Sequence, residues 1–583
     1  MKYKNLLVYL LLGILLFIFL QSTYKFHFYH LEQYQLFLFD SSYISETIQS
    51  EGGLSLLISE FLTQFYIHPY AGAIITSISL TLVGLTSYGI IRKIDREATT
   101  FVLFSLLPVV TLLFMHYNFN YLTQGTIAYL VMLAFFYSYL FINKFALKLI
   151  FAIISVFLLF WWGGSIAVLF AISLLLKELF EKPSQSHWFI IPCLEVLLLA
   201  YGSVRFGLVG DYRFAFLPDM YFHPSLKPTD FSLYYSWICL PAILLFTYIL
   251  RNKKSLSGIK LAGSIVLQIG IIAVIFWMGN NAYGDTRSLK FKEMEYYYRT
   301  QQWDSIIDMN KGKISNYLYA CMLNVALAEK GELADKMFNY TQLGEQGLFV
   351  PWNRTHAISM LLSDINYTIG NTGAAQCMAF EANISAIGKR TGRMTERLVK
   401  TNLIYGEYAV AEKYIDLLEK THYYSDWAKE QRKYLYNDKE IDENTEYSLR
   451  RKSLPNEEYL FTTNITDQEL LNLAISNPAN KNPIEYAGAM YLLTKRLDLF
   501  ENLISTYYST DVMPILPLSF QEALIILNEN NQEIWQEIGI SEGVINRFNE
   551  YKRLILTNKS NQALPQLVQN TYGKTYWYYY MFK

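Results

Sequence analysis

The sequence contains little cysteine, and its basic and acidic residues nearly cancel. The four cysteines form no C-x-x-C pair and stand in no histidine cluster with metal-ligand spacing. A zinc site or a thioredoxin-like centre is therefore not expected, and we predict no metal and no cofactor. The net charge of −1 arises from 49 basic and 50 acidic residues spread along the chain. Such a chain lacks the basic surface of a nucleic-acid binder, so we expect no nucleic-acid partner.

Long apolar runs are missing from the second half of the sequence. Before residue 285 such runs recur at membrane-spanning length, whereas later charged residues are frequent and no run reaches that length. At 583 residues the chain also exceeds one ordinary domain. We predict an all-α protein with a polytopic membrane domain at 1–284, a helical-repeat domain at 285–436, a connecting region at 437–467 and a C-terminal helical region at 468–583.

Nine segments have the composition and length of helices that cross a bilayer core of ~30 Å. The first follows Lys2 and Lys4 but has no small-residue cleavage site after Leu20, which predicts a retained anchor and not a signal peptide. The fifth and sixth are short and are joined by WWGGS, so they form either two spans or one half-membrane hairpin. The nine segments are 5–21, 70–91, 99–115, 126–142, 146–162, 165–179, 188–208, 232–250 and 259–278.

The distribution of Lys and Arg predicts the orientation of these spans, because basic residues are retained in cytoplasmic loops. With the N-terminus in the cytoplasm, the cytoplasmic loops hold thirteen Lys and Arg residues. The outer loops before residue 280 hold only Lys25, Arg205, Arg213 and Lys227. This imbalance places an amphipathic first outer loop, residues 22–69, and the whole C-terminal half outside the cytoplasm.

The C-terminal half shows a pattern of helical pairs. Three segments place apolar residues at three- and four-residue spacing around a glycine, and small residues follow each glycine. These glycines, Gly331, Gly373 and Gly406, are 42 and then 33 residues apart. The pattern resembles a degenerate array of tetratricopeptide repeats, with their period of about 34 residues, over 290–425. A solenoid presents a long concave surface, so the resemblance implies a protein partner; the alternative is a cap that packs on the membrane part and binds nothing.

Two local features of this half also carry predictions. Cys321 and Cys377 either bridge, if their domain is extracytoplasmic, or are small buried residues on helices. The final twelve residues, YGKTYWYYYMFK, are too aromatic for a flexible tail. We expect them to dock on their own domain, since aromatic rings of this kind pack on protein or at the lipid headgroup level.

Glu195 stands near the middle of the seventh predicted span, in IIPCLEVLLLAYG. A carboxylate at that depth is costly unless it is neutralised or paired, and no basic residue of a neighbouring span is an obvious mate. We expect Glu195 either to be protonated and hydrogen bonded to a neighbouring helix or to bind a functional ligand.

Three predicted outer loops bring acids, amides and arginines to one side of the membrane. The first loop also contains LSLLISEFLTQFYIHP, whose apolar residues at 54, 57, 61, 65 and 69 follow one helical face, as in a helix that lies in the membrane interface. Each acid taken alone is also consistent with solvated surface. The polar groups are His27, His30, Glu32, Gln33, Asp40, Glu46, Glu51 and Glu60 in the first loop, Asn118, Asn120 and Gln124 in the second, and Arg205, Asp211, Arg213 and Asp219 in the fourth.

Residues 1–280 resemble, in architecture, the GT-C class of membrane glycosyltransferases. The shared features are a first span, acids soon after it, interfacial helices that end in a Pro-Tyr turn, further spans and a soluble outer domain. The resemblance implies that a carboxylate of the first outer loop is the base and that the sugar donor is a polyprenyl-phosphate lipid. Carried over by position, Glu32 or Asp40 is the base, and Arg205 or Arg213 holds the lipid phosphate. The sequence lacks the adjacent pair of acids that usually follows the first span in that class.

The whole chain also resembles an uncharacterised family of bacterial envelope proteins that combine such spans with an outer helical-repeat domain. The resemblances imply a multi-pass protein of the bacterial inner membrane with a cytoplasmic N-terminus and a periplasmic C-terminal domain. Two functions stay open, namely a transferase and a non-catalytic scaffold whose repeat domain binds envelope partners. An anchor needs one span, so nine spans favour the transferase. A transporter is disfavoured because the spans lack buried charge apart from Glu195.

Overall fold

The structure is a computed structural model in which the regular elements of the described residues are all helices. Two isolated β-bridges, Tyr121 with Phe222 and Tyr508 with Met513, extend into no strand among the described residues. The predicted all-α class is therefore confirmed. The structure describes residues 2–95, 102–224, 226, 231–251, 258–284, 286–454 and 467–583.

The chain divides into two compact units. The first comprises Met1–Leu289 with the short segment Lys420–Tyr423, and the second comprises Lys290–Glu419 and Tyr424–Lys583. The main division thus falls five residues after the membrane-domain boundary predicted at residue 284.

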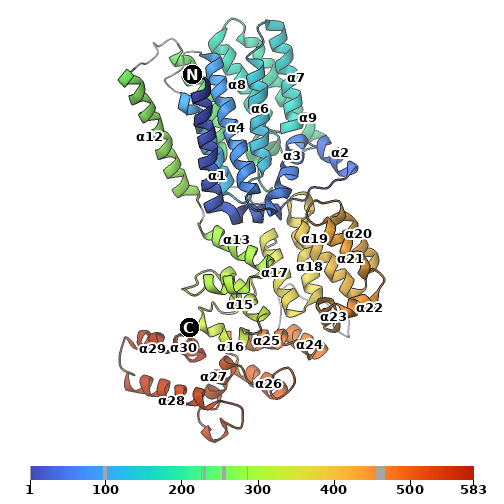
Figure 1. Ribbon diagram of the computed structural model, residues 1–583, viewed down its shortest axis with the longest axis vertical. Coiled ribbons are helices and arrows are strands. Elements are labelled where there is room, and N and C mark those ends of the chain that lie inside the picture. The colour runs from blue at the N-terminus through green and yellow to red at the C-terminus, as the bar shows by residue number, and fades with distance from the viewer. Residues whose placement is uncertain are drawn as a thin grey trace. The chain divides into compact units, whose positions relative to one another are not determined.

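The described residues of the first unit form the α-helices α1 to α12, of which α1, α4, α6 and α7 run side by side (Figure 1). They are α1 (Lys2–Glu32), α2 (Ser41–Gln49), α3 (Gly53–Thr63), α4 (Ala71–Ile94), α5 (Leu107–Tyr117), α6 (Thr123–Tyr139), α7 (Phe145–Gly163), α8 (Ile166–Glu181), α9 (Ile190–Arg205), α10 (Tyr212–Phe216), α11 (Tyr235–Leu250) and α12 (Gly258–Tyr283).

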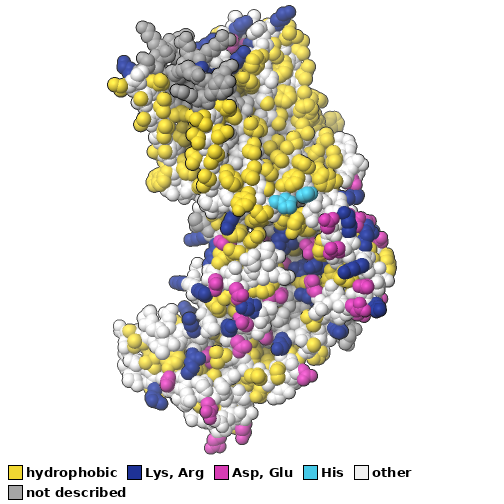
Figure 2. Space-filling model, in the orientation of Figure 1, with side chains coloured by type: hydrophobic (Ala, Val, Ile, Leu, Met, Phe, Trp, Pro, Cys, Tyr) yellow, Lys and Arg dark blue, Asp and Glu magenta, His cyan; other side chains and the backbone are white. Residues whose placement is uncertain are grey.

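The long helices of the first unit expose apolar side chains along their length. Leu10 on α1, Ile154 on α7 and Val266 on α12 are 56%, 53% and 69% exposed, and hydrophobic side chains cover most of the visible side of this unit in Figure 2. An apolar surface of this extent is unfavourable in water and is suited to lipid. The protein is therefore a multi-pass helical membrane protein.

Six helical stretches of the described chain are long and apolar enough to cross a membrane. They are Leu6–Glu32, Ala71–Ile94, Phe145–Gly163, Ser186–Arg205, Phe231–Ile249 and Gly258–Tyr283. The three remaining predicted spans coincide with the shorter apolar helices α5, α6 and α8, so the count of nine stays a prediction. Part of the third predicted span, residues 99–101, lies outside the described residues.

Helix α1 is longer than the predicted first span, and residues 22–32, which we assigned to the first outer loop, are helical. The helix continues because Tyr24, Phe28 and Leu31 keep a helical spacing and are all buried. Phe28 lies against Gly72 on α4, where no larger side chain would fit. The loop therefore begins after Glu32.

The apolar stripe predicted in the first loop lies on α3 and the following 3₁₀ helix η1 (Gln64–Ile67). Helix α3 buries Ser55, Ser59 and Thr63 and leaves Phe61 39% exposed. A small, polar face thus packs on α6 and α7, while the apolar face points outward. This arrangement agrees with a helix that lies in the membrane interface.

Two of the lysines that we counted as cytoplasmic are buried in the first unit. The Nζ atoms of Lys148 and Lys177 lie 3.1 and 2.5 Å from Oε1 of Glu178. Buried ammonium groups need such a partner, so these lysines also have a structural role.

The second unit is a succession of short helices in which α17, α18, α19, α20 and α21 each pack on the next. Its helices are α13 (Thr286–Arg299), α14 (Trp303–Met309), α15 (Tyr317–Glu329), α16 (Leu333–Lys336), α17 (His356–Ile369), α18 (Thr372–Ser385), α19 (Gly392–Tyr405), α20 (Tyr408–Glu419), α21 (Ser425–Gln431), α22 (Asp438–Glu443), α23 (Thr445–Lys452), α24 (Asp467–Ser476), α25 (Asn482–Leu493), α26 (Leu497–Tyr507), α27 (Leu518–Leu527), α28 (Glu542–Thr557), α29 (Leu564–Tyr572) and α30 (Tyr576–Phe582).

The glycine turns of the second unit differ from the prediction at one position. Gly331, Gly370 and Gly406 have φ angles of +66°, +99° and +78°, so each follows a helix in a conformation that favours glycine. Gly373, which we predicted as the middle turn, lies inside α18. The tetratricopeptide resemblance stays a prediction.

Three further predictions for the second unit concern the connecting region, the C-terminal aromatic segment and the two cysteines. The predicted connecting region contains α22 and α23, and its residues 455–466 lie outside the described residues. The C-terminal aromatic segment docks on its own unit, as predicted: Trp577 is buried, and its indole N–H donates to the carbonyl oxygen of Glu522 at 2.8 Å. Cys321 and Cys377 are free thiols.

Candidate functional site

The connection between α2 and α3 makes a tight turn at Glu51 and Gly52. Gly52 has a φ of +67°, which a residue with a side chain rarely adopts. At the other end of α2, the Asp40 carboxylate caps the helix by accepting hydrogen bonds from the N–H groups of Ser42 and Tyr43 at 3.0 and 3.1 Å. Both ends of α2 are therefore fixed.

The Glu51-Gly52 turn lies against a second glycine turn, Gly163-Gly164, which joins α7 to α8. A Cβ atom on Gly52 would lie only 3.4 Å from the backbone nitrogen of Gly164 and 3.0 Å from Nε2 of Gln124. That Gln124 amide donates to the carbonyl oxygen of Gly52 at 3.2 Å. Two backbone turns can approach this closely only because neither carries a side chain.

The 3₁₀ helix η4 (Pro218–Tyr221) closes this arrangement from a third direction. The Met220 sulfur accepts a hydrogen bond from the Ser165 N–H at 3.1 Å. The Tyr221 hydroxyl donates to the carbonyl oxygen of Gly163 at 2.6 Å and accepts from the Ile166 N–H at 3.1 Å. Segments far apart in the sequence thus meet in one buried cluster, which we call the glycine-turn cluster: Glu51, Gly52, Gln124, Gly163, Gly164, Met220 and Tyr221.

Replacement of Gly164 by alanine should destabilise this cluster. The φ of Gly164 is +80°, and a Cβ atom there would overlap the Met220 side chain. Strain and overlap together should lower the free energy of unfolding by about 1–3 kcal/mol. Thermal unfolding of the detergent-solubilised protein measures this loss of stability.

Gly202→Ala on α9 is the control, since nothing lies within 4 Å of its Cβ position, and it should leave the melting temperature unchanged or higher. Equal melting temperatures for the Gly164 variant and the unsubstituted protein would contradict the packing described.

Glu51 is the ionisable group of the glycine-turn cluster. Its side chain is half-buried, and its Oε1 atom is fully buried without a hydrogen-bond partner among the described residues. Desolvation raises the pKa of Glu51 to about 8. Burial chiefly raises the pKa of Tyr221, and the charged form of Glu51 adds to that increase. A carboxyl group with a pKa near neutrality is suited to general acid or base chemistry.

The two predicted bases occupy different environments from Glu51. Glu32 is the last residue of α1 and is buried, not part of an exposed loop. Asp40 caps α2 and forms an ion pair at 2.6 Å with Lys420, a residue of the segment that belongs to the first unit. The hydrogen bond from Lys420, followed by those from Ser42 and Tyr43, lowers the pKa of Asp40 well below its usual range. Asp40 is thus a poor proton acceptor at neutral pH.

The predicted ligand-binding residues lie on α9 and α10. Arg205 ends α9 and is exposed. Arg213, with a side chain 61% exposed, lies 3.6 Å from Asp219, and Asp219 directly precedes Met220 of the glycine-turn cluster. Glu195 lies within α9, and its Oε2 atom is buried without a hydrogen-bond partner among the described residues. The structure therefore brings Arg213 toward the same short segment that packs on Gly52.

Glu51 is one of the predicted outer-loop acids, but it is not one of the predicted site residues. The signal that could have identified it is the E-G-G triplet, in which two glycines after an acid permit a close backbone approach. The second signal is the other glycine pair in WWGGS. Nothing in the spacing shows that these two pairs meet.

Comparison with known proteins identifies a family for the whole chain. The model of a family of unknown function, DUF6057, matches residues 1–583. The chain belongs to this family. No curated protein and no solved structure matches it.

Membership in DUF6057 confirms the predicted resemblance of the whole chain to a family without an assigned activity. The GT-C and tetratricopeptide resemblances stay predictions. For this DUF6057 protein, function must be inferred from the chemistry of its own residues.

Proposed function

We propose that this DUF6057 protein is a membrane transferase that moves a sugar from a polyprenyl-phosphate lipid to an acceptor hydroxyl, with Glu51 as the base. The reaction would take place on the outer face of a bacterial inner membrane, with the N-terminus in the cytoplasm and the second unit in the periplasm. This proposal extends the GT-C resemblance but assigns the base to a residue that the resemblance did not select.

The observation that carries the proposal is the buried carboxyl oxygen of Glu51, which has no partner in the part of the chain that the structure describes. Burial without a partner costs free energy, so a group kept in that state is a candidate for function. Asp40 is less suited because it is paired with Lys420 and caps a helix. Glu32 stays a candidate second acid of the site.

Arg205 and Arg213 are the proposed phosphate ligands. Both are exposed, and a guanidinium group binds phosphate oxygens with two parallel hydrogen bonds. Arg213 is the better placed of the two, since its partner Asp219 adjoins Met220, which packs on the Glu51-Gly52 turn.

The proposed step is balanced in atoms and charge. The Glu51 carboxylate accepts the proton of the acceptor hydroxyl while that oxygen forms a bond to the anomeric carbon of the sugar. The bond between the anomeric carbon and the lipid phosphate oxygen breaks, and the phosphate keeps the electron pair and is held by arginine. Glu51 then releases its proton to water.

The raised pKa of Glu51 predicts how transfer depends on pH. A base must be deprotonated to act, and with a pKa of about 8 the deprotonated fraction rises about fivefold between pH 7 and pH 8. Transfer of a radiolabelled sugar from a polyprenyl-phosphate donor by protein in nanodiscs should rise accordingly and level off above pH 9. A rate that falls over this range would contradict a role as base and would indicate a general acid.

A non-catalytic scaffold is the second candidate function, in which the second unit binds envelope proteins. The repeated packing of consecutive helices in that unit favours it, because stacked helical pairs present extended surfaces. The transfer assay distinguishes the two functions. A scaffold transfers no label at any pH, whether or not residue 51 is charged.

A further inference from the structure

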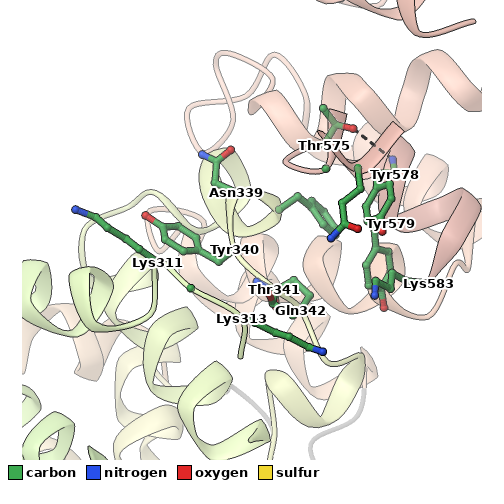
Figure 3. A pocket seen from close by; sticks show the side chains of 14 residues that line it. Lys311, Lys313, Asn339, Tyr340, Thr341, Gln342, Thr575, Tyr578, Tyr579 and Lys583 are labelled. Carbon is green, nitrogen blue, oxygen red and sulfur yellow. Dashed lines mark hydrogen bonds between the residues drawn. The ribbon is translucent and has the colours of Figure 1, made fainter. Parts of the chain in front are cut away.

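The second unit contains a cavity that neither the proposed transfer nor the family match explains. Its volume is about 470 Å³, which is within the range of sites for small molecules. Figure 3 shows that its walls come from three separate segments: the loop at 311–313 after α14, the residues at 338–342, and the C-terminal helices α29 and α30.

The floor of the cavity is held rigidly. Gln342 is buried and donates from Nε2 to the carbonyl oxygen of Met337 at 2.7 Å. The Tyr579 hydroxyl donates to the carbonyl oxygen of Leu493 at 2.9 Å, and the Thr575 hydroxyl donates to the carbonyl oxygen of Tyr572 at 2.7 Å. A ligand would therefore meet a preformed surface and would not have to order it.

The charged side chains that line the cavity all have the same sign. Lys311, Lys313 and Lys583 line it, and the described lining residues include no Asp or Glu. Of these three lysines, only Lys311 has an ion-pair partner among the described residues, the exposed Asp308 at 2.8 Å, and an exposed pair of this kind is weak. The cavity is thus suited to an anionic ligand.

The uncharged part of the lining narrows the class of ligand further. The described lining residues include no aliphatic side chain, so the apolar contacts come from aromatic rings such as Tyr340 and Tyr578. The side chains of Asn339, Gln569 and Lys313 have no hydrogen-bond or ion-pair partner among the described residues and are free to bind. Flat C–H faces that stack on aromatic rings, together with hydroxyl groups that bond to amides, are the features of a sugar.

We propose that this cavity binds a saccharide that carries a negative charge, as a carboxylate or a phosphate. Lys313 binds the charge, Tyr340 stacks on the sugar ring, and Asn339 and Gln569 bind its hydroxyl groups. A lipid chain or an apolar peptide side chain would find no aliphatic contacts there. The inference goes beyond the proposed transfer, because the second unit would bind the saccharide whether or not Glu51 is a base.

Binding of soluble probes to the full chain in nanodiscs tests this proposal. The probes are digalacturonic acid, its neutral counterpart galactobiose, glucose 1-phosphate and inorganic phosphate, followed by calorimetry at low salt. At least one charged sugar should bind with a Kd of about 1 mM or tighter, and galactobiose and inorganic phosphate should each bind at least about tenfold more weakly. The binding should weaken with added salt.

Two variants assign the binding to the cavity. Lys313→Gln should weaken binding of the charged sugar about tenfold. Tyr340→Leu should weaken binding of the charged sugar and of galactobiose. Lys574→Gln is the matched control, because Lys574 is an exposed lysine close to the cavity in sequence but does not line it. Equal melting temperatures of the variants would exclude misfolding.

Three results would overturn the proposal. These are no binding of either charged sugar, binding of inorganic phosphate as tight as that of the sugars, and equal effects of Lys313→Gln and Lys574→Gln. Loss of transfer in a Glu51 variant with unchanged saccharide binding would leave this inference intact, so the two proposals fail separately.

Discussion

Replacing Glu51 with glutamine is expected to lower the rate of sugar transfer by about 10²- to 10⁴-fold, the range that general base catalysis contributes. Glutamine keeps the size of the side chain but cannot accept the proton of the acceptor hydroxyl. The substitution removes a carboxyl group with one oxygen buried without a partner among the described residues, so the protein should be as stable as before or more so. The measurement is transfer of a radiolabelled sugar from a polyprenyl-phosphate donor in nanodiscs, with melting temperature recorded on the same samples.

Glu46→Gln is the matched control for this experiment. Glu46 lies on α2, five residues before Glu51, has the same side chain, and is exposed. It should transfer at the rate of the unsubstituted protein. If Glu51→Gln transfers equally fast, the base is another residue, and Glu32 would be the next to substitute.

Replacing Asp364 with alanine should have the largest effect on stability. Asp364 is buried on α17, and its two oxygens lie 2.5 Å from Nη2 of Arg393 and 3.0 Å from Nη2 of Arg397. Arg397 and Arg450 also stack on the ring of Tyr367, 3.6 and 3.7 Å from its centroid. Without Asp364 two mostly buried guanidinium groups lose a shared partner, which should cost about 3–5 kcal/mol.

Hydrogen exchange of the amides of α17 and α19 measures this change within the second unit. Asp304→Ala is the control, because Asp304 also pairs with a cation, Lys330 at 2.5 Å, but has a side chain that is 82% exposed. Exposed pairs contribute at most about 1 kcal/mol. A similarly small loss of protection in the Asp364 variant would show that the buried network is not what holds these helices together.

The sequence predicts those features of the fold that depend on local composition. Apolar runs identify the membrane unit and its long helices, and the aromatic C-terminus correctly predicts docking on its own unit. The predicted end of the first helix is wrong. Polar residues separate Tyr24, Phe28 and Leu31 in the sequence, but these three side chains are buried among apolar neighbours. Hydropathy falls in that stretch while the helical spacing continues, so the spacing was the better guide.

The site depends on contacts that no local pattern contains. Gly52 and Gly164 are distant in the sequence, and only the packing of α3 on α6 and α7 brings their turns together. Burial of the Glu51 oxygen, and hence its raised pKa, follows from that packing. Asp40 was a reasonable choice by position, but the pairing with Lys420 joins residues 380 apart. A cap such as that of Asp40 on α2 was predictable, since an acid precedes a Ser-Ser start.

The proposed transfer requires that the Glu51 turn and the second unit lie on the outer side of one membrane. Single cysteines at three exposed positions test this in a chain whose four native cysteines are changed to serine: Ser50→Cys beside Glu51, Lys574→Cys in the second unit, and Lys182→Cys after α8. On intact spheroplasts a membrane-impermeant maleimide should label the first two, and should label Lys182→Cys only after permeabilisation. If Ser50→Cys and Lys574→Cys require opposite conditions for labelling, the site and the second unit lie on different sides, and this account is wrong.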